Sequence, residues 1–324
     1  MPLERVTIIG GGAWGTALAQ AAANAGREVM LVARDPESVE AINTRHRNPR
    51  HLGDQPLAEA ISARTDFDEP RDFVILAVPA QASRVVLAPI GEKLAGTPVI
   101  LSAKGLERGT LKRQSEILSE MAPRAVPLIL SGPSFAVDVA AGRPTAVTLA
   151  GDDDALTESL AAALAGPALR PYAAGDRVGV ELAGGLKNVY ALACGAVEGA
   201  GLGASARAAL IARAYAELSR LVVAAGGQAS TLTGLAGLGD LTLSCTSTQS
   251  RNYRQGTLLG RGEGLSGQVG LAEGVFTAPA AQELAERLGV EAPLIGAVNL
   301  LLGAAASIET IVAGLMSRPL KREE

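Results

Sequence analysis

Histidine and cysteine are rare in this chain of 324 residues, which excludes several kinds of site. The only histidines are His46 and His51, in a polar stretch without acidic residues spaced for a proton relay or a metal site. We therefore interpret both as loop residues and expect no metal. The only cysteines, Cys194 and Cys245, are too few for a disulfide framework, and Cys194 lies in a small-residue helical run typical of a core. This cysteine usage favours a reducing cytoplasm.

The chain also lacks a large excess of either charge. Its formal net charge of −4 gives no electrostatic reason to expect nucleic acid or an anionic membrane surface as a partner. No uncharged apolar run reaches the roughly 20 residues of a membrane span. Glu4 and Arg5 near the amino end make a signal peptide the poorer interpretation. The composition predicts a cytoplasmic protein without membrane insertion. A homodimer is compatible with the sequence, which carries no pattern that specifies the oligomeric state.

A glycine-rich turn near the amino end is the most informative pattern that is present. Gly10, Gly12 and Gly15 have the spacing G-x-G-x-x-G, after an apolar run at 6–9 and before an alanine-rich helical stretch at 17–25. Such a turn lets backbone N–H groups at the start of a helix approach a pyrophosphate. A second apolar strand follows about twenty residues later, as this motif requires. The sequence therefore predicts dinucleotide binding.

Up to about residue 172, short apolar runs alternate with helical patterns. Their continuous apolar character is typical of parallel strands covered on both faces. The expected strands are residues 6–9, 29–32, 73–78, 99–102, 128–130, 146–149 and 169–172, and the expected helices between them include 83–94, 111–121 and 153–165. This order predicts an α/β fold, a Rossmann-like doubly wound parallel sheet with ligands at the carboxyl ends of the strands.

After Gly175 the pattern becomes helical. Long helices are expected at 180–197, 205–225, 272–288 and 293–316. Ser205 is the expected N-cap of the second of these helices. The segment 234–270, which is rich in Gly, Ser and Thr, is expected to be a loop. The sequence thus predicts a dinucleotide-binding Rossmann domain over 1–177 and an all-α domain carrying the substrate and catalytic groups over 178–324.

Lysine is scarce as well, and two of the lysines lie where a solvated cation is not expected. The five lysines are Lys93, Lys104, Lys112, Lys187 and Lys321. Lys104 follows the strand at 99–102, so it lies at the carboxyl edge of the predicted sheet. Lys187 has small helical neighbours, among them Ala183, Gly184 and Ala191, which leave a hollow around the ammonium group. Because lysine can release its proton near neutral pH and arginine cannot, both are candidates for the reacting site.

Three further segments carry polar groups suited to a phosphorylated ligand. Residues 131–136 (Ser-Gly-Pro-Ser-Phe-Ala) form an amide-rich turn after a strand. Asp240, after a glycine-rich stretch, is either a turn aspartate or a site residue. Arg251 stands between Ser250 and Asn252, and its planar guanidinium with two flanking hydrogen-bonding side chains suits a phosphate oxyanion.

Together these segments resemble a known family over nearly the whole chain. Its motifs match, in order, residues 10–17, 103–107, 132–136, 181–190, 234–241, 250–252 and 273–275. The chain is similar to bacterial-type NAD(P)-dependent sn-glycerol-3-phosphate dehydrogenase. The resemblance implies a Rossmann domain followed by a helical domain like the carboxyl-terminal domain of 6-phosphogluconate dehydrogenase. It also implies reduction of dihydroxyacetone phosphate to sn-glycerol 3-phosphate for glycerophospholipid synthesis.

The resemblance also implies roles for individual residues, with Lys187 as the catalytic proton donor and acceptor. Substrate positions are matched by Lys104, Gly132, Ser134, Lys187, Asp240, Ser250, Arg251 and Asn252. Cofactor positions are matched by Gly10, Gly12, Ala13, Trp14, Gly15, Arg34, Lys104, Ala136, Arg251, Leu271 and Glu273. The chain departs from the family at residues 50–53 (Arg-His-Leu-Gly) and 78–80 (Val-Pro-Ala), which affects details of the loop over the cofactor.

The residues after the second strand bear on the choice of cofactor. Arg34 stands where an NAD-specific site usually holds the ribose 2′-hydroxyl with an acid, and a guanidinium there favours the 2′-phosphate of NADP. Asp35 is adjacent and could still accept from the hydroxyl. We therefore expect NADPH to be preferred and NADH to be tolerated.

Two other functions share parts of this pattern. A β-hydroxyacid dehydrogenase or ketopantoate-type reductase has the same two-domain plan and a lysine acid, but its substrate carries a carboxylate. A non-catalytic NADP-binding redox sensor needs the dinucleotide site but not Lys187, Asp240 and the residues at 250–252. The presence of that polar set favours the enzyme.

Overall fold

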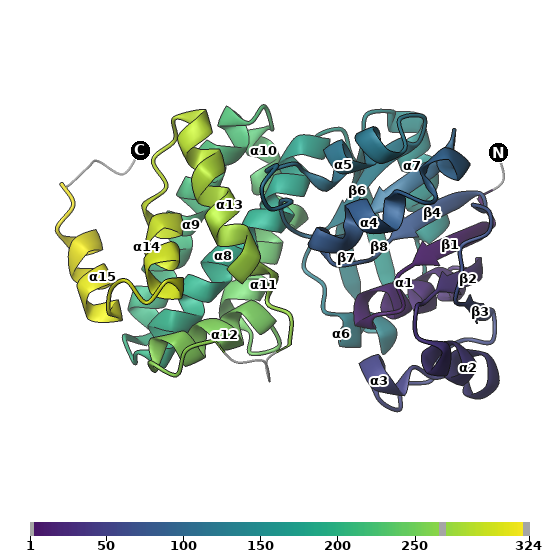
Figure 1. The fold of residues 1–324 in the computed structure, drawn as a ribbon, viewed down its shortest axis with the longest axis horizontal. Helices are drawn as coiled ribbons and strands as arrows, with labels where there is room; N and C mark the ends of the chain where they lie inside the picture. The colour runs from purple at the N-terminus through teal and green to yellow at the C-terminus, as the bar shows by residue number, and fades with distance from the viewer. Residues whose placement is uncertain (1–2, 266–269, 320–324) are drawn as a thin grey trace.

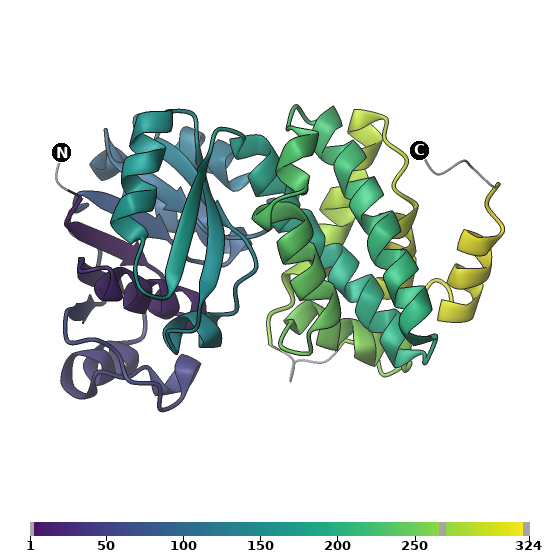
Figure 2. The same ribbon diagram turned by 180° about the vertical axis from the view of Figure 1, so that it is seen from behind.

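The computed structural model describes residues 3–265 and 270–319, which form a sheet half and a helical half side by side (Figures 1 and 2). One eight-stranded sheet has the order β3-β2-β1-β4-β5-β6-β7-β8. The strands are β1 (Arg5–Ile9), β2 (Glu28–Val32), β3 (Ile61–Arg64), β4 (Phe73–Leu76), β5 (Pro98–Leu101), β6 (Val126–Ser131), β7 (Thr145–Gly151) and β8 (Leu169–Ala174). The strand order reverses between β1 and β4, and ligands of such sheets bind at the carboxyl ends beside that reversal.

Both faces of the central strands are buried, as their unbroken apolar sequences predict. Along β4, Phe73 and Ile75 pack into one hydrophobic cluster and Val74 and Leu76 into another, because successive side chains point to opposite faces. Helices of this half cover these faces or lie beside the sheet. The helices are α1 (Ala13–Asn24), α2 (Pro36–Arg45), α3 (Pro49–Leu52), α4 (Ser83–Leu87), α5 (Gln114–Met121), α6 (Ala136–Ala140) and α7 (Asp154–Leu164), with the 3₁₀ turns η1 (Ala80–Ala82) and η2 (Gly91–Leu94).

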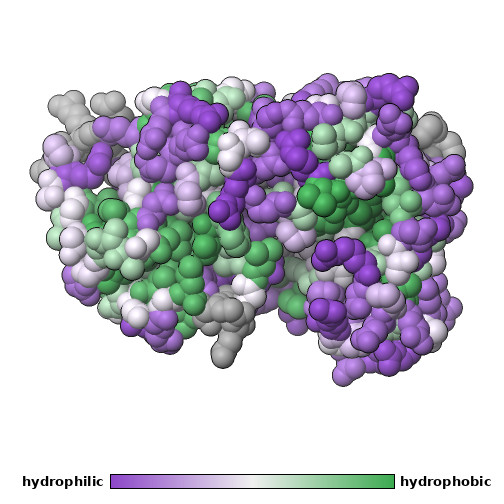
Figure 3. Space-filling model, in the orientation of Figure 1, coloured by the Kyte–Doolittle hydropathy of each residue, from purple (hydrophilic) through white to green (hydrophobic). Residues whose placement is uncertain are grey.

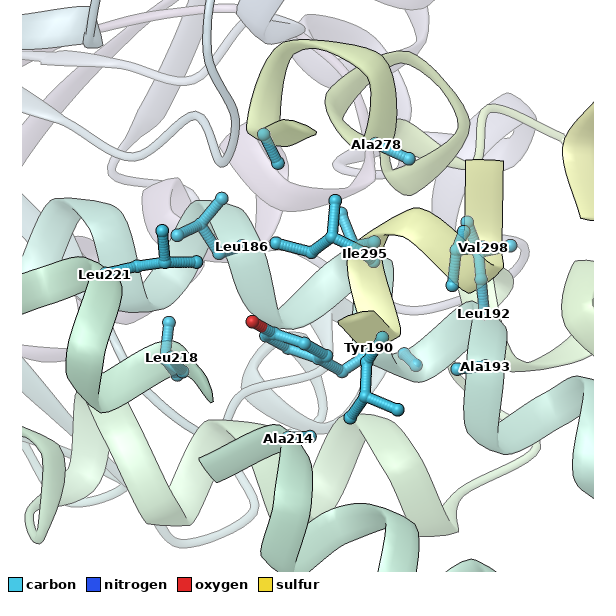
Figure 4. Close-up of a cluster of buried hydrophobic side chains, with 14 of the residues drawn as sticks. Leu186, Tyr190, Leu192, Ala193, Ala214, Leu218, Leu221, Ala278, Ile295 and Val298 are labelled. Atoms are coloured by element: carbon cyan, nitrogen blue, oxygen red, sulfur yellow. The ribbon is translucent and has the colours of Figure 1, made fainter. Parts of the chain in front are cut away.

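The helical half is assembled around one long buried helix, α8 (Arg177–Gly199). Its neighbours are α9 (Gly203–Ala224), α10 (Ala229–Leu232), the π-helical turn η3 (Leu235–Gly239), α11 (Asp240–Thr246), α12 (Arg251–Gly260), α13 (Glu273–Leu288), α14 (Pro293–Leu302) and α15 (Ile308–Met316). Nearly every residue of α8 is buried. Figure 4 shows the Tyr190 ring lying among Leu218, Ile295 and Leu186.

Glycines on facing sides bring α8 and α12 close together. A Cβ atom on Gly195 would lie 2.0 Å from the Tyr253 carbonyl oxygen, and one on Gly256 would lie 2.0 Å from that of Leu192. Any larger side chain at these positions would force the two helices apart. The small-residue composition of α8 is therefore a packing requirement.

Several expected elements differ in detail from the structure. The expected helix at 83–94 is interrupted, because Pro89 has no N–H to continue it. The strand β3 was not expected from the sequence. Ser205 is not an N-cap, since α9 begins at Gly203. The expected helix at 293–316 is divided into α14 and α15, and α5 begins only at Gln114. Strands β6 and β7 pair antiparallel, so the sheet is predominantly rather than wholly parallel.

The segment 234–270 was wrongly expected to be a loop. Its described part contains η3, α11 and α12. Ala236 and Leu241 are fully buried there, against the core of the protein. Packing against α8 thus overrides the weak helix propensity of the glycine-rich sequence.

Hydrophobic side chains gather on the surface over the helical half (Figure 3). Helix α15 has no buried residue, and the side chain of Met316 is 80% exposed. Among the described residues no helix combines the length and apolar character needed to cross a membrane. A homodimer stays a prediction.

Asp176 holds the start of α8 and should matter for stability. Its carboxylate accepts hydrogen bonds from the N–H groups of Gly179 and Gln228, both at 2.8 Å, and from Thr231 Oγ1 at 2.5 Å. We expect Asp176→Ala to lower the free energy of unfolding by about 2 kcal/mol or more, because one buried and two part-buried donors lose their acceptor. Asp153→Ala is the matched control, an exposed cap with one such bond, and should cost at most about 1 kcal/mol. Equal losses in urea unfolding would contradict the special role of Asp176.

Candidate active site

The glycine turn between β1 and α1 has a different requirement at each glycine. Gly10 has a φ of +123°, and a Cβ there would lie 2.4 Å from the Ala77 carbonyl oxygen. A Cβ on Gly15 would lie 1.8 Å from the Gly10 oxygen, so this glycine lets the helix pack on the turn. A Cβ on Gly12 would meet nothing within 4 Å. Gly12 therefore leaves open space beside the first N–H groups of α1, which fits a pyrophosphate.

The next predicted cofactor residues lie around this turn. Ala13 and Trp14 begin α1, and the indole Nε1 of Trp14 is buried without a hydrogen-bond partner. Arg34 is exposed beyond the end of β2. The neighbouring Asp35 carboxylate accepts hydrogen bonds from Ser38 Oγ at 2.6 Å and from Arg50 Nη1 at 3.2 Å. The bond from Ser38 lowers the pKa of Asp35, with a further contribution from Arg50.

Lys187 lies on α8 and is directed into the protein, with only 5% of its surface exposed. Its ammonium donates to the carboxylate of Asp240 and, at 2.8 Å, to Ser244 Oγ. Burial lowers the pKa of Lys187 to about 7, because removal from water disfavours the charged form. Asp240 opposes this shift, and the nearby ammonium of Lys104 adds to it. Both protonation states of Lys187 are therefore accessible near neutral pH.

Asp240 joins the two halves of the molecule. Its second carboxylate oxygen accepts a 2.6 Å hydrogen bond from Lys104 Nζ, which also approaches the Gly132 carbonyl oxygen at 3.4 Å. Lys104 follows β5, whereas Asp240 begins α11 and Lys187 belongs to α8. The structure thus brings three of the predicted site residues together, with one buried carboxylate between two lysines.

Two glycines of α8 let this helix approach the carboxyl ends of β5 and β6. A Cβ on Gly184 would lie 2.3 Å from Ser131 Oγ, and one on Gly185 would lie 3.1 Å from the Gly105 nitrogen. Ser131 Oγ is buried there without a hydrogen-bond partner. Lys187 therefore reaches the sheet edge because Gly184 and Gly185, in the preceding turn of its helix, carry no side chains.

Sequence reasoning missed Ser244 and Ser131. Ser244 stands four residues after Asp240, a spacing that places both on one helix face. That signal could not be used while the segment was interpreted as a loop. Ser131 directly precedes Gly132 in a turn that was singled out, but only Gly132, Ser134 and Ala136 were assigned from it.

The turn after β6 is shaped by Gly132. This residue has a φ of +148°, and a Cβ on it would lie 2.9 Å from Val147 Cα in the neighbouring strand. Ser134 Oγ donates to the Gly132 carbonyl oxygen at 3.0 Å, and Ala136 begins α6. The turn thus holds Ser134 and Ala136 at the same sheet edge as Lys104.

Residues 250–252 make internal contacts as well as flanking the site. Ser250 Oγ caps α12 by accepting from the Tyr253 N–H. Asn252 donates from Nδ2 to Asn188 Oδ1 at 2.9 Å and accepts from the Gly274 N–H at 2.8 Å. Contacts of Ser250 and Asn252 with substrate stay predictions, whereas their part in positioning α12 and α13 is visible. Arg251 is exposed.

Glu273 makes a second connection between the halves. Its carboxylate accepts a 3.2 Å hydrogen bond from the Ala80 N–H, after β4, and burial raises its pKa. Leu271, Glu273 and Phe276 line a cavity of about 220 Å³ together with Ala80 and Arg108. The predicted cofactor residues Leu271 and Glu273 therefore face the loop that follows the strand next to β1.

The histidines do not lie in a plain loop. His46 ends α2 in a left-handed conformation, and His51 belongs to α3. Burial lowers the pKa of His51, with the Arg50 cation contributing. Within residues 3–265 and 270–319, no three His, Cys, Asp or Glu side chains gather at a spacing suited to a metal ion.

A glycine turn at the reversal point of a parallel sheet, facing a buried lysine of a helical half, defines the class of two-domain NAD(P)-dependent dehydrogenases. Within that class, the chain belongs to the NAD-dependent glycerol-3-phosphate dehydrogenase family. The models of the family's amino-terminal and carboxyl-terminal parts match residues 5–157 and 176–313. This confirms the family resemblance and the fold class expected from the sequence.

Individual relatives agree with this assignment. The chain is 49% identical to glycerol-3-phosphate dehydrogenase [NAD(P)+] of Caulobacter vibrioides over all of both chains, and 49% identical to that of Brucella canis over 99% of each. A solved glycerol-3-phosphate dehydrogenase from Coxiella burnetii superposes with a TM-score of 0.91 at 35% identity, covering 97% of this chain and 99% of the other. D-mandelate dehydrogenase, at 16% identity and a TM-score of 0.61, shares the fold alone.

The glycine turn yields a prediction that separates binding from folding. Gly12→Ala should leave the free energy of unfolding within about 1 kcal/mol of the original protein, because its Cβ meets no atom, yet weaken NADPH binding by blocking close approach of the pyrophosphate. Gly15→Ala is the contrasting variant and should destabilise the protein, because its Cβ would overlap the turn. Calorimetric titration and urea unfolding measure the two effects. Unchanged NADPH affinity in Gly12→Ala would remove this turn from the cofactor site.

Proposed function

We propose that this protein interconverts dihydroxyacetone phosphate and sn-glycerol 3-phosphate with NADPH or NADH as the reductant. The observation that carries this proposal is the buried Lys187–Asp240–Lys104 arrangement between a dinucleotide-type sheet and the helical half. Family membership supports the substrate, and the glycine turn supports the cofactor. The product is the backbone of glycerophospholipids, so the reaction supplies lipid synthesis in the cytoplasm.

Lys187 supplies the proton in the direction of reduction. When bound, the reduced nicotinamide supplies a hydride to the C2 carbonyl carbon of the substrate. Negative charge develops on the carbonyl oxygen, which the Lys187 ammonium stabilises and then protonates, leaving a neutral amine. In the reverse direction the amine takes the hydroxyl proton. A pKa of about 7 suits both directions, since neither form is rare near neutral pH.

The neighbours of Lys187 orient it and adjust its charge. Asp240 and Ser244 accept hydrogen bonds from its ammonium and so restrict the direction of its proton. Lys104 balances the Asp240 carboxylate and places a cation at the sheet edge, near the Gly132–Ser134 turn. With Arg251 it provides the positive charge that a phosphate-bearing substrate requires. A substrate that carries a carboxylate in place of the phosphate has less negative charge for a second cation to neutralise.

The exposed guanidinium of Arg34 favours the 2′-phosphate of NADP at the end of β2. The adjacent Asp35 is engaged by Ser38 and Arg50, which weakens its capacity to hold a ribose hydroxyl. NADPH is therefore the preferred cofactor and NADH is tolerated.

Removal of the lysine amine is the direct test. Lys187→Ala should bind NADPH normally but reduce dihydroxyacetone phosphate about 10²–10⁴-fold more slowly, the usual contribution of a positioned general acid. NADPH absorbance follows the reaction, and calorimetry follows binding. Lys93→Ala is the control, because that lysine binds the Asp68 carbonyl oxygen on an exposed surface. A near-normal kcat in Lys187→Ala would refute the proposed mechanism.

The pH dependence tests how Lys187 is tuned. Reduction requires the ammonium, so kcat for reduction should fall as pH rises above about 7, whereas kcat for oxidation should fall below it. Lys104→Met removes a repelling cation and should move this transition to higher pH. Asp240→Asn removes the attracting carboxylate and should move it to lower pH. Saturating kcat profiles separate these shifts from weaker substrate binding, and shifts in the same direction would contradict the charge arrangement.

A further inference from the structure

The short helix α3 joins two parts of the dinucleotide site that are far apart in the sequence. Asn48, directly before α3, is fully buried and donates from Nδ2 to the Gly11 carbonyl oxygen at 2.9 Å and to Thr16 Oγ1 at 2.8 Å. These bonds attach the start of α3 to the glycine turn and to α1. In a trans peptide the C=O and N–H point in opposite directions, so the Gly12 N–H faces away from Asn48. Asn48 thus orients a donor of the pyrophosphate turn.

The same helix also contacts the residues that follow β2. Arg50 Nη1 lies 3.2 Å from Asp35 Oδ2, and this oxygen also accepts a 2.6 Å bond from Ser38 Oγ. Asp35 is adjacent to Arg34, which occupies the position where an NAD-specific site usually carries an acid, and Asp35 is the acid that could still accept from the ribose 2′-hydroxyl. Here the Oδ2 atom of that acid is committed to Ser38 and Arg50. The Arg50 side chain is 67% exposed, so its remaining donors are accessible to a ligand.

We propose that Arg50 is a specificity-determining residue that sets the preference for NADPH over NADH. It withdraws Asp35 from the ribose hydroxyl and adds a second guanidinium, beside Arg34, for the 2′-phosphate. The inference rests on the proposed function and extends it to a residue that the G-x-G-x-x-G pattern does not indicate.

The local charge supports this assignment. Arg34, Asp35 and Arg50 together carry one net positive charge, which suits a phosphate. Without Arg50 the remaining pair is neutral, which suits a hydroxyl. His51 adds little positive charge, because burial and the Arg50 cation lower its pKa. Asn48 keeps this helix against the glycine turn, so Arg50 and the pyrophosphate donors belong to one site.

The test compares Arg50→Gln with Arg47→Gln. Both variants remove one positive charge from the same segment, but Arg47 Nη1 is directed to the Asp54 carbonyl oxygen at 2.8 Å. Trp14, the one tryptophan of the chain, lies in the glycine motif, so its fluorescence reports binding of NADPH and NADH without turnover. Arg50→Gln should lower the affinity for NADPH relative to NADH about tenfold, the effect of losing a hydrogen bond to a charged group. Arg47→Gln should leave the ratio of the two affinities unchanged.

Asp35→Asn provides a second arm. Added to Arg50→Gln, it removes the uncompensated carboxylate and should restore part of the NADPH preference. Arg34→Ala is the reference for loss of a 2′-phosphate contact and should also lower the ratio. A wild-type preference for NADPH that persists in Arg50→Gln, or an equal change in Arg47→Gln, would overturn the inference and leave the proposed function intact. Failure to reduce dihydroxyacetone phosphate, with the Arg50 effect on binding present, would overturn the proposed function alone.

Discussion

The sharing of one buried carboxylate by two lysines is the interaction on which the rest of the structure depends. Asp240 is 1% exposed and accepts from Lys187 of the helical half and Lys104 of the sheet half. Two ammonium groups this close repel each other, and burying either one in isolation is costly. The carboxylate makes the arrangement tolerable only while both halves are in contact. The charge state of Lys187 is therefore coupled to the packing of the halves.

The sequence of α8 allows the two halves to make this contact. Gly184 and Gly185 let the helix approach the sheet edge, and Gly195 lets α12 approach on a later turn. Between them, Tyr190 anchors the helix in the largest apolar cluster of the helical half. A small-residue helix is usually weakly specified, because it offers little side-chain area to bury. Here the small residues bury little side-chain area but allow close contact between backbones. The bulky residues at intervening positions form the hydrophobic core.

Much of this site could be predicted from the sequence, and what could not has a physical explanation. The glycine turn and Lys187 carry local signals, namely a fixed spacing and a cation among small residues, and the structure shows both in the predicted settings. The helix that begins at Asp240 was missed because its glycine-rich approach has poor intrinsic helix propensity, and only burial of residues such as Leu241 stabilises it. The antiparallel β6–β7 pair was missed for a related reason, since a continuous apolar run carries no information about strand direction.

At both ends of the predicted ligand site a carboxylate is paired with neighbouring cations, but the pairing is stronger at one end than at the other. In each, flanking cations decide what a carboxylate can do: Lys187 and Lys104 at Asp240, and Arg50 at Asp35. Asp240 is buried, so the interactions there are poorly screened and a change in one partner is felt strongly by the others. The Asp35 side chain is 29% exposed and its arginine 67%, where ion pairs are weak and screened by salt. The proposed proton transfer at Lys187 therefore tolerates little change, whereas the proposed control of cofactor preference lies at the surface, where single substitutions leave Lys187 undisturbed.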